Sequence, residues 1–507
     1  MINSILMFIV MASALLFGAV EIWSSSVILA LVYSLGLVWT LGRGYADYSS
    51  PPHTKLLMIT GFTFTLYACL QIVPLPLIML KYLSPGAHRL REFYSLEPSR
   101  NAAISLVPYR SLLEVLKVAA FFIVFSVAST YFISRDRLKS FVIALSVFGF
   151  CLAVFAIVQK ATWNGRVYWF RELSMGGEPF GPFVNRNHFA GFTGMIIPLT
   201  LGLAIIKHTR EKKIFYGFLS VIMSVAVFFS LSRGGIVSFC SGMALFGVLL
   251  LASRLQQRKV WLIGIFLVAV LTYLVWLGVD PIMARFSQTD ITKEQRLIVW
   301  STTLTAAKDF WLTGSGLGTF LNVFPLYSPA SVQSIYDHAH NDYLEFLLET
   351  GLGGALLLAC FIGILLRSVF RSSFEGRQGI MLMAALSSMT SMAVHSLFDF
   401  NLHILSNLLL FGMVLGMIAA LSDVDDPHPP RERRKTARAR EQAANGEELM
   451  REREHAKKEA EETPDQDAGS EDRPSNKPGP APGPVAEEDG ITPETMEEWE
   501  KELKKNR

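Results

Sequence analysis

The stretch DHAHNDYLEFLLETGLGGALLLACFIGILL, residues 337–366, runs from a knot of polar side chains into an apolar segment long enough to cross a membrane. A transmembrane helix requires about 20 consecutive, mainly apolar residues. Histidine, asparagine and aspartate are costly near lipid, and such residues in membrane proteins usually mark function. This stretch therefore predicts a membrane-spanning fold and points to the place where its chemistry lies.

Apolar runs of this kind recur along the whole chain. Of its 507 residues 51% are hydrophobic and 36 are phenylalanine, which is too apolar for an ordinary soluble protein. The runs predict an all-α polytopic membrane protein with about 12 transmembrane helices, the first of which is a retained span rather than a signal peptide. Their approximate bounds are 3–20, 26–42, 55–73, 112–133, 140–158, 189–206, 214–231, 235–252, 260–279, 343–366, 379–397 and 403–421.

The distribution of lysine and arginine predicts the topology. Every second short loop is basic, and cytoplasmic loops hold the excess of these residues. Both termini are therefore predicted to be cytoplasmic, with long outer loops at about 81–111 and 280–342 and a medium one at about 160–187. The largest of them lies between the ninth and tenth spans. The basic loops are residues 43–55, 135–139, 207–213, 254–259 and 367–377.

Charge also separates a tail from the membrane domain. Residues 1–422 form the predicted transmembrane domain, and residues 423–507 form a charged cytoplasmic tail. The tail opens with a basic segment suited to an anionic leaflet and continues with a composition typical of disorder. A short helix is expected over residues 492–505, where Met496 and Trp499 suggest a docking partner, although a solubilising extension is the simpler interpretation. The net charge of only +3 gives no indication of a nucleic-acid partner.

The four cysteines lie within apolar runs at spacings that fit neither a metal site nor a disulfide framework. We interpret them as packed core residues, with no redox or zinc role. They are Cys69, Cys151, Cys240 and Cys360.

The distinctive polar motifs all fall on the predicted outer side of the membrane. Scattered structural residues would not be expected to share one side, so the coincidence predicts an extracytoplasmic site. The motifs are Glu21 with Trp23, the segment GPFVNRNHFAG with Asn185, Arg186, Asn187 and His188, the SLSRGG turn with Arg233, the loop residue Arg296, the DHAHND knot, and the DFNLH turn with Asp399, Asn401 and His403.

Arg233 has two interpretations. It could be an interfacial residue that snorkels beside a span. However, the positive-inside rule disfavours arginine in a tight outer turn, and Gly234 and Gly235 would let a substrate or another backbone approach closely. A guanidinium donates two parallel hydrogen bonds to oxyanions and stays charged, so it suits a lipid-linked diphosphate.

The segment that follows Arg296 predicts an amphipathic helix on or just above the membrane, because Leu297, Trp300, Leu304 and Ala307 have helical spacing. Arg296 itself is either a solvated residue near a helix start or part of the site. The GSGLG that follows lacks the spacing and the preceding strand of a nucleotide-binding turn. We interpret Gly314, Gly316 and Gly318 as residues that shape a loop.

His340 and Asn341 divide two roles between them. Asn341 is suited to cap the helix that begins near residue 342, with Glu345 nearby. Capping does not explain His340, whose imidazole has an ordinary pKa near 6.5 and suits removal of a proton from a sugar hydroxyl. A metal site of Asp337, His338, His340 and Asp342 is an alternative, but no well-spaced further ligand is evident.

These motifs resemble those of the bacterial O-antigen ligase and O-antigen polymerase superfamily. Its ligase signature, a histidine, then asparagine, serine or glutamine, nine residues and G-x-x-G, is met by His340, Asn341, Gly351 and Gly354. The SRGG turn, the R-L-x-x-W stretch at Arg296 and the G-x-G-x-G-x-F segment complete the likeness. It covers residues 180–420 firmly and the N-terminal spans loosely.

The resemblance implies a membrane glycosyltransferase of the GT-C type in the bacterial inner membrane, independent of metal and of nucleotide and needing no cofactor. It would move a glycan from an undecaprenyl-diphosphate carrier to a glycan or lipid acceptor on the periplasmic face. His340 would be the catalytic base or activating residue for an acceptor hydroxyl, and Arg233 and Arg296 would bind the diphosphate and stabilise the charge that builds on the leaving group. Arg186, His188, Asn341 and Glu21 are candidate substrate-binding residues.

Three functions stay open at this point. A ligase would transfer a finished glycan, and a polymerase of the same superfamily would join lipid-linked repeat units. About twelve spans also suit a transporter or flippase, which should show internal repeats and polar helices near the bilayer midplane. The polar residues here lie at the outer rim instead.

Overall fold

A computed structural model of the protein describes residues 2–42, 51–94, 100–173, 177–207, 209–253, 259–277, 291–330, 332 and 334–422. The predicted tail, including the helix expected over residues 492–505, lies outside the described residues. Within them the structure is almost entirely helical, and its only sheet is a pair of two-residue strands. The all-α class predicted from the sequence is confirmed.

A helix occupies each of the predicted spans. Seven of these helices, α2, α6, α7, α8, α9, α10 and α15, are long and apolar enough to cross a membrane by length and composition. A polytopic membrane protein is therefore confirmed, while the count of about 12 spans stays a prediction. The helices are α1 (Ile2–Leu15), α2 (Ile22–Leu41), α3 (Pro52–Leu70), α6 (Pro108–Tyr131), α7 (Arg135–Ala161), α8 (Arg186–Ile206), α9 (Arg210–Phe229), α10 (Arg233–Ala252), α11 (Val260–Leu277), α15 (Asp342–Phe370), α16 (Gly376–His395) and α17 (Leu405–Leu421).

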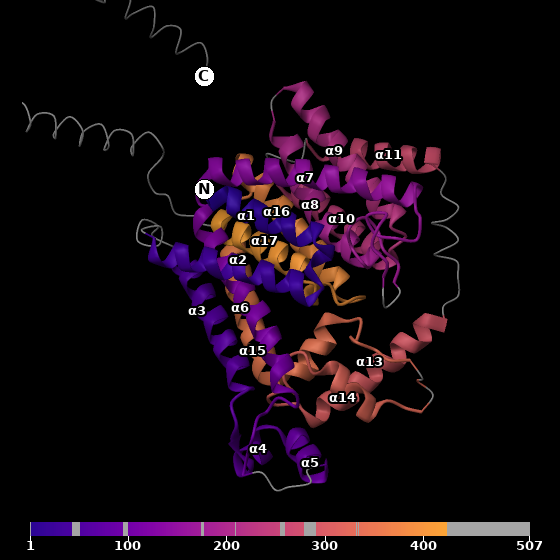
Figure 1. Cartoon of the computed structure of the whole chain (residues 1–507). Helices are drawn as coiled ribbons and strands as arrows, with labels where there is room; N and C mark the ends of the chain where they lie inside the picture. The colour runs from indigo at the N-terminus through magenta and orange to yellow at the C-terminus, as the bar shows by residue number, and fades with distance from the viewer. Residues whose placement is uncertain are drawn as a thin grey trace, which may run out of the picture. The chain divides into compact units, whose positions relative to one another are not determined.

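Helix α8 lies at the centre of the packing. Of its span, 94% is buried, and it packs against α7, α9, α10 and α16 (Figure 1). Small residues let the backbones approach, because a Cβ at Gly202 would lie 2.9 Å from the Cβ of Ala384 on α16. Close contact through small residues is the usual way in which membrane helices associate. The ends of α8 and α16 are consequently held in fixed positions.

The predicted outer loops hold a second, smaller core. Short strands β1 (Leu75–Pro76) and β2 (Asn101–Ala102) pair antiparallel, with Leu75 opposite Ala102, and α4 (Leu77–Leu83) and α5 (Pro85–Tyr94) follow β1. Helices α13 (Ile291–Asp309) and α14 (Phe320–Tyr327) complete this region beside the start of α15 (Figure 1). The buried side chains that form the core include Leu80, Ala306, Phe310, Phe320, Phe324 and Leu348.

Helix α13 occupies the segment where an amphipathic helix was predicted, but its buried face differs in part. Ala307 is buried and Trp300 is partly buried, as expected from the apolar stripe. Leu297 and Leu304 are 61% and 44% exposed, and Val299 is buried in their place. The helix is fixed by protein contacts on one face, so only part of the stripe contributes to the core.

The interpretation of the cysteines as core residues is wrong for three of them. Cys151, Cys240 and Cys360 are exposed on the outer faces of their helices, and Cys69 is partly buried. Apolar runs do not show which face of a membrane helix meets protein, because lipid-facing residues are apolar too.

Helix α15 is broken at Gly351, whose φ of 60° and ψ of −162° are not helical. At the break, several backbone groups have no hydrogen-bond partner within the helix. The glycine-rich loop before α14 supplies their partners. Gly314, Gly316 and Gly318 all have positive φ, which confirms that they shape a loop. The hydrogen bonds run from Ser315 N to Leu348 O (3.0 Å), Gly316 N to Glu349 O (3.0 Å), Leu352 N to Trp311 O (2.7 Å) and Gly353 N to Leu312 O (3.0 Å).

Candidate functional site

A cavity of about 210 Å³, here called the site cavity, brings together three arginines that the sequence analysis singled out. It lies where α8 and α10 begin and α16 ends. The concentration of positive charge suits a ligand with several anionic oxygens. Its lining residues are Glu178, Asn185, Arg186, Asn187, Leu231, Arg233, Gly234, Arg296, His395, Phe398 and Asp399.

Arg186 and Arg233 are placed side by side because their helices begin together. The Asn185 side chain accepts a hydrogen bond from Asn187 N (2.8 Å) and caps α8. Ser232 caps α10 by accepting from Gly235 N (3.1 Å), and its hydroxyl donates to Asn187 Oδ1 (2.7 Å). These bonds link the two helix starts, so both guanidinium groups line one cavity. Arg186 is also ion-paired with Glu178.

The glycines after Arg233 permit close approach of other segments, as their pattern predicted. A Cβ at Gly235 would lie 2.5 Å from the Cβ of Ala190, and a Cβ at Gly234 would lie 3.3 Å from His395 Cδ2. The SRGG turn therefore packs against α8 and α16 through backbone. Larger residues would separate the arginine from the rest of the site.

Helix α13 contributes Arg296 and Trp300 one turn apart. Arg296 lines the site cavity, and its Nη1 makes a long hydrogen bond to Phe398 O (3.4 Å). Trp300 Nε1 donates to Ala339 O (3.1 Å), next to His340. In the R-L-x-x-W pattern, Arg296 therefore lines the cavity, and Trp300 hydrogen-bonds to the backbone of the segment that carries His340.

His340 pairs with Asp399, which lines the site cavity, but His340 itself is not among the lining residues. The His340 Nδ1 lies 3.1 Å from Asp399 Oδ1, and Asp399 lines the cavity while its side chain is 1% exposed. Burial favours the protonated carboxyl, but the hydrogen bond with His340 and the charges of nearby histidines outweigh it. The pKa of Asp399 is therefore well below its usual range. The backbone of His340 is left-handed, with φ 49°, a conformation rare for residues other than glycine.

The ring of Phe400 packs against three histidines. Its centroid lies 4.2 Å from that of His338, 5.0 Å from that of His188 and 5.1 Å from that of His340. His188 is 4% exposed and does not line the site cavity. His188 packs against Phe400 in an edge-to-face arrangement, and its role in substrate binding stays a prediction.

A second network joins the DHAHND knot to the turn before α17. Glu345 Oε1 lies 2.7 Å from His338 Nδ1 and 3.3 Å from His403 Nε2, and Asp342 Oδ1 lies 3.0 Å from His403 Nδ1. Burial acts to lower the pKa of His403, but the charges of Glu345 and Asp342 raise it to about 10. The network holds the segment that carries His340 against residues 399–403.

Donor atoms of His338, Glu345 and His403 lie within 4.8 Å of one another, close enough to share a metal ion. This set differs from the alternative considered from the sequence, which included His340 and both aspartates. The same atoms already hydrogen-bond with one another, and Ala339 N donates to Glu345 Oε2 (2.8 Å). Both oxygens of Glu345 and both ring nitrogens of His403 are therefore already paired within the protein.

Several buried polar atoms at the site cavity have no hydrogen-bond partner among the described residues. They are Oδ2 of Asp399 and both ring nitrogens of His395. Both residues line the cavity and are 1% exposed. Buried polar atoms without partners are costly, so this wall is suited to a polar ligand or to water.

Two predicted site residues have other partners. The Asn341 side chain accepts from Tyr343 N and Leu344 N, both at 3.1 Å, which confirms its role as the cap of α15. Glu21 pairs with Arg171 at 2.6 Å and does not line the site cavity. Through these bonds, neither residue contacts Arg186, Arg233 or Arg296.

Sequence reasoning missed His395 and Glu178. His395 lies at the end of an apolar run, where an ionisable residue is itself a signal of function. Glu178 falls in a loop with no pattern around it. A larger cavity of about 500 Å³ lies at the opposite ends of α8 and α16, and no histidine is among its described lining residues.

The helices and the site cavity define a polytopic membrane protein with a cation-rich polar centre at one end of its helices. A family model described as O-antigen ligase matches residues 218–359, which include Arg233, Arg296, His340, Gly351 and Gly354. This match confirms, over residues 218–359, the resemblance to the O-antigen ligase and polymerase superfamily. It indicates an O-antigen ligase or polymerase type of membrane glycosyltransferase. No curated protein matches the chain.

Proposed function

We propose that this protein transfers a glycan from undecaprenyl diphosphate to an acceptor hydroxyl on the periplasmic face, as an O-antigen ligase does. One observation supports this most strongly. Arg186, Arg233 and Arg296 line a single cavity whose wall also holds Asp399, the partner of His340. Cations for a diphosphate and a base for a hydroxyl are the two groups that the reaction requires.

The proposed orientation follows from the positive-inside rule, with about twelve spans of the GT-C type and both termini in the cytoplasm. The loop at about residues 160–187, which precedes α8, is then on the periplasmic side. The site cavity lies where α8 begins, so it faces the periplasm as well. The basic loops at residues 135–139 and 207–213 lie at the other ends of the spans and face the cytoplasm. A lipid carrier would present its diphosphate to the arginines from the outer leaflet.

His340 would act as the base through its Nε2. An ionised Asp399 accepts a hydrogen bond from Nδ1–H, which leaves Nε2 able to accept a proton. The acceptor oxygen forms a bond to the anomeric carbon of the glycan while the bond from that carbon to the diphosphate oxygen breaks. The proton of the acceptor hydroxyl moves to His340, and undecaprenyl diphosphate leaves.

The arginines would bind the diphosphate and stabilise the charge that builds on it. The leaving group needs no proton, so fixed cations are the main help the protein can give. Arg233 comes from α10 and Arg296 from α13, so two separate helices supply these cations to one cavity. We propose that both contact the diphosphate. Arg186, which is ion-paired with Glu178, adds to the positive electrostatic potential at the same place.

The deciding experiment replaces His340 with alanine in the native host and identifies the lipid-linked glycan that accumulates. Accumulated long chains without their final acceptor would support a ligase. Accumulated single repeat units would instead indicate the polymerase of the same superfamily. Unaltered surface and lipid-linked glycans would refute both functions and leave the transporter as the alternative.

His88→Ala provides the matched control. His88 lies on α5, also on the predicted periplasmic side, and faces Glu92 at 3.6 Å. It does not line the site cavity. The same amounts of both variants should be present in the membrane, and only His340→Ala should accumulate a lipid-linked glycan.

A further inference from the structure

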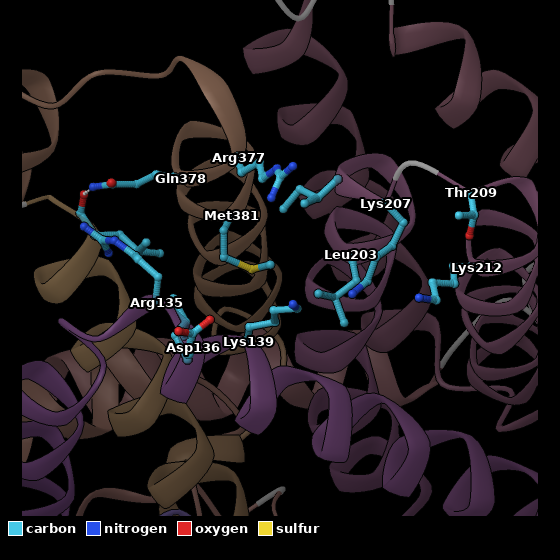
Figure 2. Close-up of a pocket in the computed structure, with 13 residues that line it drawn as sticks. Arg135, Asp136, Lys139, Leu203, Lys207, Thr209, Lys212, Arg377, Gln378 and Met381 are labelled. Carbon is cyan, nitrogen blue, oxygen red and sulfur yellow. Dashed lines mark hydrogen bonds between the residues drawn. The ribbon is translucent and has the colours of Figure 1, made fainter. Parts of the chain in front are cut away.

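The larger cavity, here called the basic cavity, has a volume of about 500 Å³ and is lined by a ring of cations over an apolar floor (Figure 2). Among the described residues that line it, five are basic and one, Asp136, is acidic. The basic residues are Arg135, Lys139, Lys207, Lys212 and Arg377. The apolar residues are Leu138, Leu203, Ile206, Met381 and Leu421.

Three basic loops that are distant in the sequence meet at this cavity. Residues 135–139 begin α7, Lys207 directly follows α8, Lys212 is in the first turn of α9, and Arg377 is in the first turn of α16. In Figure 2 the side chains of Lys139, Lys207 and Arg377 reach the space beside Met381 from these different elements. The positive-inside rule requires basic loops on one side, but it does not require them to surround one cavity.

The walls of the basic cavity are held in place by protein contacts. Gln378 Nε2 donates to Leu421 O (2.9 Å), and Arg135 Nη1 makes a long hydrogen bond to Ala420 O (3.5 Å). The first bond fixes the start of α16 to the last turn of α17, and the second fixes the start of α7 to the same turn. The cavity is therefore a feature of packed helix ends rather than of a loose loop.

Electrostatics in the cavity favour an anion. Burial lowers the pKa of Lys207, and the like charges of Lys139, Lys212 and Arg377 lower it further. Like charges this close repel one another, and an anion that binds between them offsets this repulsion and stabilises their charged forms. A phosphate group accepts hydrogen bonds from several such side chains at once.

The position of the cavity indicates an amphiphile rather than a free anion. The cavity lies at the ends of α8 and α16 opposite the site cavity, and the 21 residues of α8 place the two roughly 30 Å apart. That separation is about the thickness of the hydrocarbon core of a bilayer. With the orientation proposed above, the cations lie at the cytoplasmic headgroup level and the apolar floor lies toward the acyl chains.

We propose that the basic cavity binds the phosphate headgroup of an anionic phospholipid of the inner leaflet, with the acyl chains along its apolar floor. Basic cavities between transmembrane helices on the cytoplasmic side commonly hold such headgroups. Lys139, Lys207 and Arg377 contact the phosphate. The site is separate from the glycosyl-transfer site and rests only on the proposed orientation.

The test uses the full-length protein and a triple variant, Lys139→Gln, Lys207→Gln and Arg377→Gln. The control removes the same charge with Lys55→Gln, Lys213→Gln and Arg371→Gln, which are in the basic loops but do not line the cavity. Native mass spectrometry would follow binding of phosphatidylglycerol and of phosphatidylcholine to protein in detergent. We expect phosphatidylglycerol to bind the wild type and the control alike and the triple variant about 100-fold more weakly.

Four outcomes would overturn the proposal. The triple variant could bind phosphatidylglycerol as the wild type does, or phosphatidylcholine could bind the wild type equally well. Inorganic phosphate that displaces the lipid at the same concentration would show a site for a free anion. Carbodiimide cross-links from Lys139 or Lys207 to acidic residues of the 423–507 tail in the membrane would show that the tail occupies the cavity. Lys139→Gln alone, at an exposed position, tests the same site if the triple variant fails to fold.

Discussion

The break in α15 leads to a prediction about Gly351 that can be worked from the structure. An alanine Cβ at this position would lie 2.6 Å from Gly314 N and 2.7 Å from the carbonyl carbon and oxygen of Leu312. All three are backbone atoms, so no side chain can turn away to make room. The φ of 60° is also unfavourable for alanine.

The two effects add. Backbone strain of this kind costs about 1–3 kcal/mol, and overpacking costs a similar amount. We therefore expect Gly351→Ala to lower the free energy of unfolding by about 3 kcal/mol or more. Because Gly351 belongs to the segment that positions His340, glycan transfer should fall together with stability.

Two glycines serve as controls because a Cβ at either would meet open space. Gly363 is in the same helix with ordinary helical backbone, so alanine there should be neutral or stabilising by up to about 1 kcal/mol. Gly376 has φ 64°, so alanine there adds strain without a clash and should cost about 1 kcal/mol.

The assay heats the purified protein in detergent and measures the folded fraction by size-exclusion chromatography. The expected order of midpoints is Gly363→Ala at or above wild type, then Gly376→Ala, then Gly351→Ala well below both. A midpoint for Gly351→Ala equal to that of wild type would refute the packing of the loop against the break.

Further predictions concern the polar networks. Asp399→Asn should lower the rate of glycan transfer by about 100-fold or more with little change in thermal midpoint, because it removes the charged partner of His340, and a purified transfer assay would show this. A loss of folded protein in proportion to activity would contradict it. His403 should stabilise the fold fully below pH 6.5, its ordinary pKa, and progressively less as the pH rises through about 10, its pKa in the folded protein. The midpoint of wild type should therefore fall more between pH 7 and pH 10 than that of His403→Gln, and parallel curves would exclude the effect. Transfer should also survive treatment with EDTA, because His338, Glu345 and His403 satisfy one another, and loss of activity restored by a divalent metal would show that they hold an ion.

The sequence predicted the elements of this protein better than the contacts between them. Each span could be located because lipid requires a long apolar run, and the three arginines could be selected because they depart from the positive-inside rule or follow recognisable motifs. The pairing of His340 with Asp399 could not be predicted, because 59 positions separate them and no local pattern encodes the contact. Periodicity likewise gives no sign that α15 breaks, since a helix can contain glycine without breaking.

The buried face of α13 shows a similar limit. Apolar spacing selected Leu297 and Leu304, yet both are exposed while Val299 is buried. A helix beside a membrane has two apolar environments available to it, and the sequence pattern does not distinguish protein from lipid. The chemistry of single residues was therefore more informative than the pattern of their neighbours.

The hydrogen bonds between the glycine-rich loop and the break in α15 have a consequence for protein engineering. The segments 311–318 and 348–354 complete each other's backbone hydrogen bonding, so they form one exchangeable unit although about 30 residues separate them. Chimeras between relatives that aim to change acceptor choice should take both segments from the same parent. A junction placed between residues 318 and 348 would combine a loop from one parent with a helix break shaped for another.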